Sequence, residues 1–303
     1  MSSTAKNTWD QLTGVGDTMA PSLPRSSIVV GLGTTTMISN RAPKNQHQKL
    51  LHYRVILEHI DHNIRSFRNA RELVTVIRDA FIAFDDAFQI AHILHRDISI
   101  ANITIKEMNG RTTGVLLDWD VCKDLTRPSS SNRHIERIGT WEFMSGSLVA
   151  GATVHTREDG VESFYYILNY VASLFLQHPE KIESLVPSIY NIFISRLRRS
   201  NGFPLPSRSK LYFVAGGSLA VTPSNPRILS ILEATSQVFG ARYAEIKVTA
   251  EDDEEDIRGA RNLIEKRRQM LQKHRWLSDY LTTELNGSGW NEAADPVDRE
   301  ADF

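Results

Sequence analysis

The chain has 303 residues, of which 41% are hydrophobic and 23% are charged, a balance typical of a protein with one large or two modest domains. Its formal net charge of −1 excludes the strongly basic composition that binding to nucleic acid or an anionic membrane would favour. The single cysteine, Cys122, excludes an internal disulfide, and the N-terminus lacks the apolar stretch of a signal peptide, so we expect the cytoplasm or the nucleus as the location.

The first 60 residues indicate short strands between polar segments. Residues 1–26 and 40–48 are polar or rich in Gly and Pro, which favours irregular structure. Between and after them, SSIVVGL and YRVILEHI are dense in Val and Ile, as strands are. We therefore expect residues 1–60 to form a small unit that contains β-strands.

A long amphipathic helix is predicted from Arg71, because apolar residues recur there at steps of three and four. These residues are Leu73, Ile77, Phe81, Phe84, Phe88 and Ala91. Two strand-like runs follow, NITI from Asn102 and GVLL before Asp118, and an Asn109-Gly110 pair suits a hairpin turn between them. Such a hairpin would bring Asn102 and Asp118 to the same open end.

The rest of the chain favours helices joined by irregular segments. The Ser-rich stretch 121–140 is expected to be a mobile loop, with Ser129–Ser131 as candidate phosphorylation sites. The apolar run Val161–Leu176 is expected to form a helix that is buried on all sides. Further expected elements are a helix over 184–199, a connector over 202–226 with a strand-like LYFVAG, an acidic solvated segment at 251–256 and a charged helix over 258–285. We place a helical domain at 61–245 and an acidic and charged tail at 246–303.

One short stretch, HRDISIAN at 95–102, contains the residue types that phosphoryl transfer needs. Transfer from ATP requires a carboxylate that orients the acceptor hydroxyl and oxygen ligands for Mg²⁺. Asp97 is the candidate base, and Asn102 and Asp118 are candidate ligands, because Mg²⁺ prefers such oxygens. Each residue also has an ordinary explanation: a surface ion-pair cluster for His-Arg-Asp, a turn residue for Asn102 and a strand-end cap for Asp118.

Four ordered motifs resemble those of protein kinases, and most closely those of the fungal-type protein kinases. HRDISIAN resembles the catalytic loop, LLDWD the metal motif, and GTWEFMS and DGVES two later segments of that group. The resemblance covers about Arg54 to Ile192. It implies an α+β, protein kinase-like fold with a mostly helical C-lobe, a catalytic β-hairpin and, in this chain, a reduced N-lobe that contains β-strands.

The resemblance also implies roles for individual residues. Asp97 corresponds to the catalytic base, and Asn102 and Asp118 to the residues that hold Mg²⁺ beside ATP. Arg96 corresponds to a residue that can bind a phosphate on the 121–140 loop. Ser99 stands where most protein kinases place a lysine that neutralises the γ-phosphate of ATP. The implied cofactors are ATP and Mg²⁺, and the implied partner is a protein substrate.

Two features depart from the family pattern. Few residues precede Tyr53, GLGTTT lacks the third glycine of a phosphate-binding loop, and neither Lys44 nor Lys49 lies in a strand typical of the ATP-binding lysine. Gly160 lies where the family usually has an aspartate that anchors the catalytic loop, with Asp159 one residue earlier.

Three functions therefore stay open. The first is an active protein Ser/Thr kinase, since the catalytic and metal side chains are present. The second is a degenerate kinase-like binding module, a pseudokinase, since no nucleotide clamp is evident. The third is a small-molecule phosphotransferase, against which Arg96 and the GTWEFMS segment argue.

Overall fold

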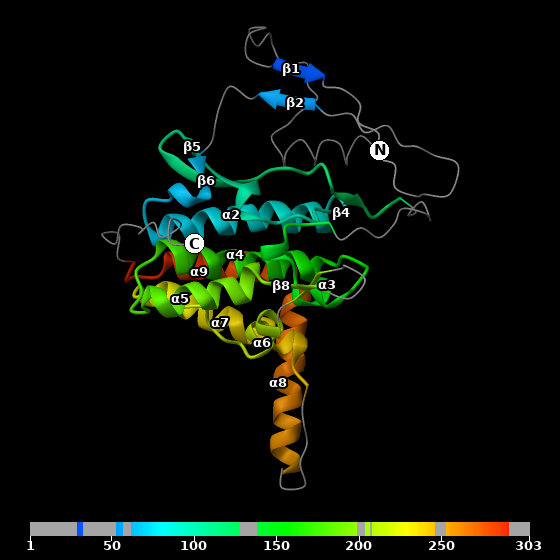
Figure 1. The fold of residues 1–303 in the computed structure, drawn as a ribbon, viewed down its shortest axis with the longest axis vertical. Coiled ribbons are helices and arrows are strands. Elements are labelled where there is room, and N and C mark those ends of the chain that lie inside the picture. Colours follow the sequence, from blue (N-terminus) through cyan, green and yellow to red (C-terminus); the bar gives the residue numbers. More distant parts are fainter. Residues whose placement is uncertain are drawn as a thin grey trace.

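The computed structural model describes residues 29–32, 53–56, 62–127, 138–198, 204–206, 208–245 and 253–290. These residues form an α+β arrangement of mainly helices with small antiparallel sheets (Figure 1). Within these ranges, every helix is too short or too polar to cross a lipid bilayer.

The expected strands of the N-terminal segment appear as β1 (Val29–Leu32) and β2 (Tyr53–Ile56). They pair antiparallel, with Val29 opposite Ile56. The remainder of GLGTTT, both Lys44 and Lys49, and the loop residues 128–137 with their candidate phosphorylation sites lie outside the described residues.

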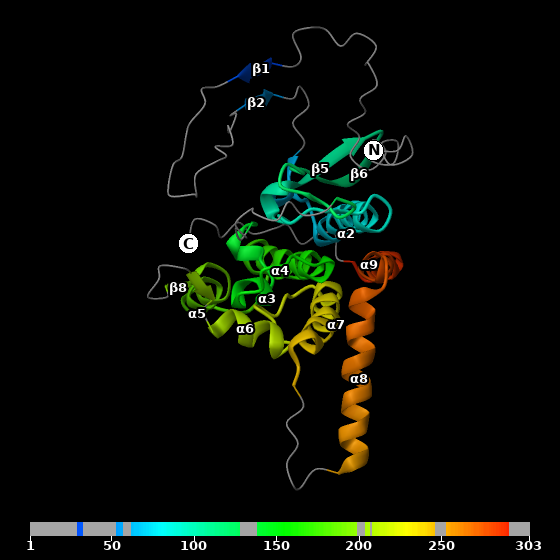
Figure 2. The same ribbon diagram turned by 90° about the vertical axis from the view of Figure 1, so that its right-hand side faces the viewer.

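The predicted amphipathic helix is confirmed as α2 (Ala70–Gln89). Its N-cap, Asn69, accepts a hydrogen bond from the backbone N–H of Glu72, which satisfies one of the donors at the helix start. The apolar face is buried. One side of α2 packs on the hairpin and the other on the helices below it (Figures 1 and 2).

The predicted hairpin is confirmed as β5 (Ile103–Met108) and β6 (Arg111–Leu116). Its turn residues Asn109 and Gly110 have φ of 52° and 73°, the left-handed backbone that the favoured two-residue hairpin turn requires. Gly114 lets β6 approach α2, because a Cβ there would lie 2.0 Å from the carbonyl oxygen of Val76. A short strand, β3 (His62–Asn63), pairs with β5 and makes this a three-stranded sheet. Strands β4 (Ile93–Leu94) and β7 (Lys123–Asp124) pair in a separate two-stranded sheet.

The predicted buried helix is confirmed as α4 (Arg157–Phe175), which begins four residues earlier than expected. The earlier start follows from a capping box. The side chain of Thr156 accepts from the backbone N–H of Asp159, and the carboxylate of Asp159 accepts from the backbone N–H of Thr156. Aromatic rings surround the helix: Phe164 lies edge-on to Phe81 of α2, with ring centroids 5.3 Å apart. Helix α4 is therefore the centre of the main core.

Further helices and short strands complete the described part of the chain. In chain order they are η1 (Ile64–Ser66), η2 (Ile100–Asn102), η3 (Trp141–Phe143), α3 (Gly146–Ala150), α5 (Ile182–Ile189), the π-helical turn η4 (Tyr190–Ile194), β8 (Arg196–Arg198), β9 (Pro204–Pro206), α6 (Arg208–Ala215), α7 (Pro226–Tyr243), α8 (Glu254–Gln272) and α9 (Trp276–Asn286).

Two predictions in this part were wrong. LYFVAG belongs to helix α6, because Lys210, Phe213 and Val214 recur at helical spacing and are buried together, whereas a short apolar run by itself fits either structure. The helix expected over 184–199 ends at Ile194, and the chain continues as β8, which pairs with β9. The two strands are close in the sequence, with Arg198 opposite Pro204 and Arg196 opposite Pro206.

The C-terminal helix was also predicted too simply, since it is broken into α8 and α9 at Arg275, whose φ is 59°. The acidic block is partly helical: Glu254–Asp256 form the first turn of α8, where carboxylates are favourable. In both views α8 extends away from the other helices (Figures 1 and 2).

Two adjacent aspartates of α2 hold the α8–α9 junction in place. Asp85 forms an ion pair with Arg157 of α4 and accepts a hydrogen bond from the backbone N–H of Arg275. Asp86 forms an ion pair with the Arg275 guanidinium and lies 3.0 Å from Nε2 of His274. These contacts fix the C-terminal helices on α2.

Candidate functional site

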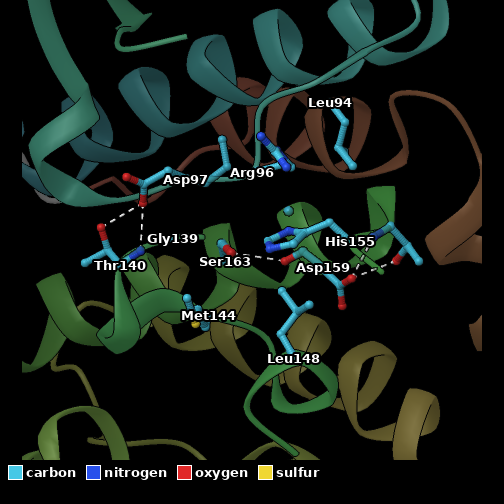
Figure 3. Close-up of a pocket in the computed structure, with 13 residues that line it drawn as sticks. Leu94, Arg96, Asp97, Gly139, Thr140, Met144, Leu148, His155, Asp159 and Ser163 are labelled. Carbon is cyan, nitrogen blue, oxygen red and sulfur yellow. Dashed lines mark hydrogen bonds between the residues drawn. The ribbon is translucent and has the colours of Figure 1, made fainter. Parts of the chain in front are cut away.

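The carboxylate of Asp97 is held by one residue from a distant part of the chain. Its Oδ1 accepts hydrogen bonds from the backbone N–H (2.8 Å) and from Oγ1 (2.7 Å) of Thr140. Thr140 is the N-cap of η3, and both residues line a small pocket between the catalytic loop and the start of α4 (Figure 3). Asp97 stays partly exposed, and Thr140 bonds only its Oδ1. Its role as the base that accepts the proton of an acceptor hydroxyl stays a prediction.

A buried histidine connects Asp97 to the metal motif. Nδ1 of His95 accepts a hydrogen bond from the N–H of Asp97 at 3.2 Å, and Nε2 donates to the carbonyl oxygen of Leu117 at 2.9 Å. Burial lowers the pKa of His95, which favours this neutral, Nε2-protonated form. The ring of Trp119 packs edge-on against His95, with centroids 4.5 Å apart. The loop thus has a rigid support.

The hairpin register brings Asn102 next to the metal motif. The N–H of Leu117 donates to the carbonyl oxygen of Asn102 at 2.8 Å, so the two segments remain paired just before Asp118. Nδ2 of Asn102 donates to the carbonyl oxygen of Asp97 at 2.9 Å, which orients the side-chain oxygen of Asn102. Asp118 is exposed and has a left-handed φ of 59°. Joint binding of one Mg²⁺ by Asn102 and Asp118 stays a prediction.

The donor types at this end of the hairpin fit Mg²⁺. An amide oxygen and a carboxylate are hard ligands, and Mg²⁺ beside a nucleotide typically takes only one or two protein ligands, with phosphate and water completing the set. The described part of the chain contains no cluster of three or more His, Cys, Asp or Glu that could hold a metal. Asn102 and Asp118 are the residues that would hold the ion.

The other predicted site residues lie around this loop. Nε of Arg96 donates to the carbonyl oxygen of Val121 at 2.7 Å, beyond the metal motif. Ser99 is buried, and its hydroxyl has no hydrogen-bond partner among the described residues. Cys122, predicted to be inert, is half-buried, and burial raises the pKa of its thiol, which lowers its reactivity.

The space beside Gly160 is filled by an aromatic ring. A Cβ at Gly160 would lie 2.5 Å from Phe84 of α2, so this position has no room for an aspartate that would reach the catalytic loop. Neighbouring Asp159 is bonded elsewhere, to the hydroxyls of Ser145 and Ser147 and to Arg242. The loop is held instead through Thr140, His95 and Asn102, as described above.

A buried ionic cluster lies below the pocket. Arg242 of α7 pairs with Asp159 (2.6 Å) and with Glu162 (2.7 Å), both on α4. Glu162 also accepts hydrogen bonds from the hydroxyl of Tyr243 and from the backbone N–H of Gly146. The cluster therefore joins α3, α4 and α7, the elements under the catalytic loop.

Sequence reasoning missed the contribution of Thr140. The GTWEFMS segment was recognised as a motif, and a hydroxyl residue directly before an apolar turn is a recognisable N-cap pattern. Nothing local, however, indicates that this Thr bonds a carboxylate 43 residues away.

The comparisons with known proteins agree with this geometry. The sequence profile of one family, described as fungal protein kinase, matches residues 4–172, which is more than half of the chain and includes the catalytic loop, the hairpin and most of α4. A search of curated proteins gives no significant match. The chain therefore belongs to the fungal protein kinase family.

Proposed function

We propose that the chain transfers the γ-phosphate of ATP to a Ser or Thr hydroxyl of a protein. The observation that carries this proposal is the fixed orientation of Asp97: Thr140 bonds one carboxylate oxygen, and Asn102 bonds the backbone of the same residue. A carboxylate fixed on one side and accessible on the other suits a residue that orients an acceptor hydroxyl.

Each residue has a definite task in this proposal. Oδ2 of Asp97 accepts the hydroxyl proton and directs the oxygen toward the phosphate. Asn102 and Asp118 bind Mg²⁺, which, when bound with ATP, offsets the negative charge of the phosphates. His95 keeps Asp97 and Leu117, the neighbour of Asp118, at a constant separation through its two ring nitrogens.

We expect the transfer to be slow. Ser99 takes the place of a lysine, and a buried, uncharged hydroxyl does not neutralise a γ-phosphate. The sequence before Tyr53 also supplies no identified lysine for the α- and β-phosphates. Nucleotide held mainly from the side of the hairpin binds weakly, because few charged groups contact its phosphates.

The alternative is a kinase-like binding module, and one observation favours it. Phe84 fills the space beside Gly160, so the catalytic loop lacks the carboxylate anchor that its relatives use. A displacement of about 1 Å at Asp97 can cost about 10²-fold in rate. A protein in which the loop shifts in this way would keep its binding surfaces and lose transfer.

A labelled-phosphate transfer assay with Mg²⁺-ATP and a mixed protein substrate distinguishes the two. We expect slow transfer that falls at least about 10²-fold in both Asp97→Asn and Asp118→Asn. Glu107→Gln is the matched control, because Glu107 is a carboxylate on the same hairpin that is exposed and pairs with Arg68.

Two results would contradict the proposal. Transfer that survives both substitutions would come from another protein or another site. Absence of transfer in the unmutated chain, with Mg²⁺-ATP still raising its melting temperature, would favour the binding module.

A further inference from the structure

A buried lysine lies under the segment that holds Asp97. Lys210 of α6 is 1% exposed. Its Nζ donates to the carbonyl oxygens of Trp141 (3.0 Å) and Glu142 (2.9 Å) and lies 4.5 Å from the ring centroid of Tyr166. Buried ammonium groups are costly and therefore need strong partners. Both hydrogen-bond partners are backbone atoms of the short turn η3.

This turn is closed at both of its ends. At its start, the N–H groups of Phe143 and Met144 each donate to the carbonyl oxygen of Thr140 at 3.0 Å. At its end, the carbonyls of Trp141 and Glu142 point toward Lys210. One turn of helix is weak in isolation, since few internal hydrogen bonds support it. Within the turn, the Trp141 carbonyl accepts only a long hydrogen bond from the N–H of Met144, at 3.4 Å, and Lys210 adds a shorter donor to it and a donor to the Glu142 carbonyl.

The same turn begins at the residue that holds the carboxylate. Thr140 donates its N–H and its hydroxyl to Oδ1 of Asp97. We propose that Lys210 is a positioning residue for Asp97, acting through η3 and Thr140 without contacting the reacting groups. As a statement about catalysis, this inference rests on the proposed kinase function.

The surroundings of Lys210 support a specific role. The charged groups that face it are Glu162 of α4, Glu142 of η3 and Arg196 of β8, and Arg196 also covers the ring of Trp141 at 5.1 Å. An apolar side chain in this space would avoid the desolvation cost, but only a donor with several N–H groups joins both carbonyls. The position of η3 therefore depends on the nitrogen of Lys210.

The test combines Lys210→Met, which keeps the volume and removes the donors, with Lys210→Arg, which keeps donors. Tyr165→Phe is the matched control, because it removes a buried hydroxyl that donates to Ser218, near α6 but away from η3. Two quantities are measured: amide hydrogen exchange at Thr140, and the rate of phosphate transfer.

We expect Lys210→Met to speed exchange at Thr140 by about tenfold or more and to lower kcat about tenfold, with the KM for ATP changed by less than about twofold. Lys210→Arg should recover most of both, and Tyr165→Phe should alter neither. Unchanged exchange at Thr140 in Lys210→Met overturns the inference, as does an equal effect of Tyr165→Phe.

The exchange measurement keeps this inference separate from the proposed function. If the unmutated chain transfers no phosphate, the proposed function fails, and Thr140 exchange still decides whether Lys210 positions the turn. If Lys210→Met does not fold, the test uses the unmutated chain. Amide hydrogen exchange in a denaturant series should then give the same opening free energy for the N–H groups of Thr140, Phe143 and Met144. Independent opening of Thr140 overturns the inference.

Discussion

Asp97 and Asp159 face the same pocket but are bound in opposite ways (Figure 3). Thr140 bonds one oxygen of Asp97, and the residue stays partly exposed. Asp159 is buried, and both of its oxygens are bonded: Oδ1 by Ser145, Ser147 and Arg242, and Oδ2 by the N–H and hydroxyl of Thr156.

Under the proposed function, this difference separates the candidate base, Asp97, from a carboxylate that supports the fold, Asp159. Burial acts to raise the pKa of Asp159, but Arg242 and the hydroxyls of Ser145 and Ser147 outweigh it, so that the pKa is lowered. Both oxygens of Asp159 therefore hold neighbouring elements together, whereas Thr140 bonds only one oxygen of Asp97.

The largest expected effect on stability comes from replacing Arg242, the cation that pairs with the buried carboxylate of Asp159. Arg242→Met leaves Asp159 and Glu162 buried without their charged partner, and we expect it to lower the free energy of unfolding by about 3–5 kcal/mol. Urea unfolding followed by circular dichroism measures this. A loss below about 1 kcal/mol would mean that the hydroxyls alone suffice to hold the cluster.

The packing of Gly160 against Phe84 gives the next largest expected effect. In Gly160→Ala the added methyl would overlap the ring of Phe84, and we expect a loss of about 2 kcal/mol in the free energy of unfolding. The control is Gly259→Ala in α8, where a Cβ meets nothing within 4 Å; helix propensity should make it more stable by about 1 kcal/mol. If both variants were more stable than the unmutated chain, the ring of Phe84 would be able to move away from the added methyl at little cost.

The pH dependence of stability tests a third buried charge. Burial lowers the pKa of Lys210 to about 7, below its value in the unfolded chain, so the folded state binds this proton less tightly. Stability should therefore rise as the pH increases above 7, by about 1 kcal/mol between pH 7 and pH 8. Lys210→Met should lack this rise; an equal rise in both proteins would assign it to other groups.

The smallest effect on stability is expected at Asp97, the candidate base. Asp97→Asn keeps an oxygen that can accept from Thr140, so the free energy of unfolding should change by less than about 1 kcal/mol. Transfer should nevertheless be lost. Thermal melting and the transfer assay on one preparation test both statements, and a strongly destabilised Asp97→Asn would remove the contrast with Asp159.

Local patterns in the sequence were sufficient for α2, α4 and the β5–β6 hairpin, because helical periodicity, a dense apolar run and an Asn-Gly turn act over a few residues. They also indicated the candidate side chains Asp97, Asn102 and Asp118. The bond from Thr140 to Asp97 and the bonds from Lys210 to η3 join residues 43 and 68 to 69 positions apart, which no local pattern specifies.

Packing between distant residues also decides two features that the sequence left open or predicted wrongly. Gly160 indicated a missing anchor, but only the packed structure identifies Phe84 as the group in its place. LYFVAG was ambiguous because strand and buried helix share its composition, and the choice was made by packing around α4.

The contacts of Asp85 and Asp86 have a consequence for protein synthesis. Arg275 lies 189 residues after Asp86, so at about 5–20 residues per second a ribosome needs about 10–40 s to deliver the partner of that aspartate. During this interval Asp86 lacks its ion-pair partner, whereas Asp85 can pair earlier with Arg157, which lies 72 residues after it. The nascent chain therefore completes the contacts of Asp85 and Asp86 only after the α8–α9 junction has left the exit tunnel.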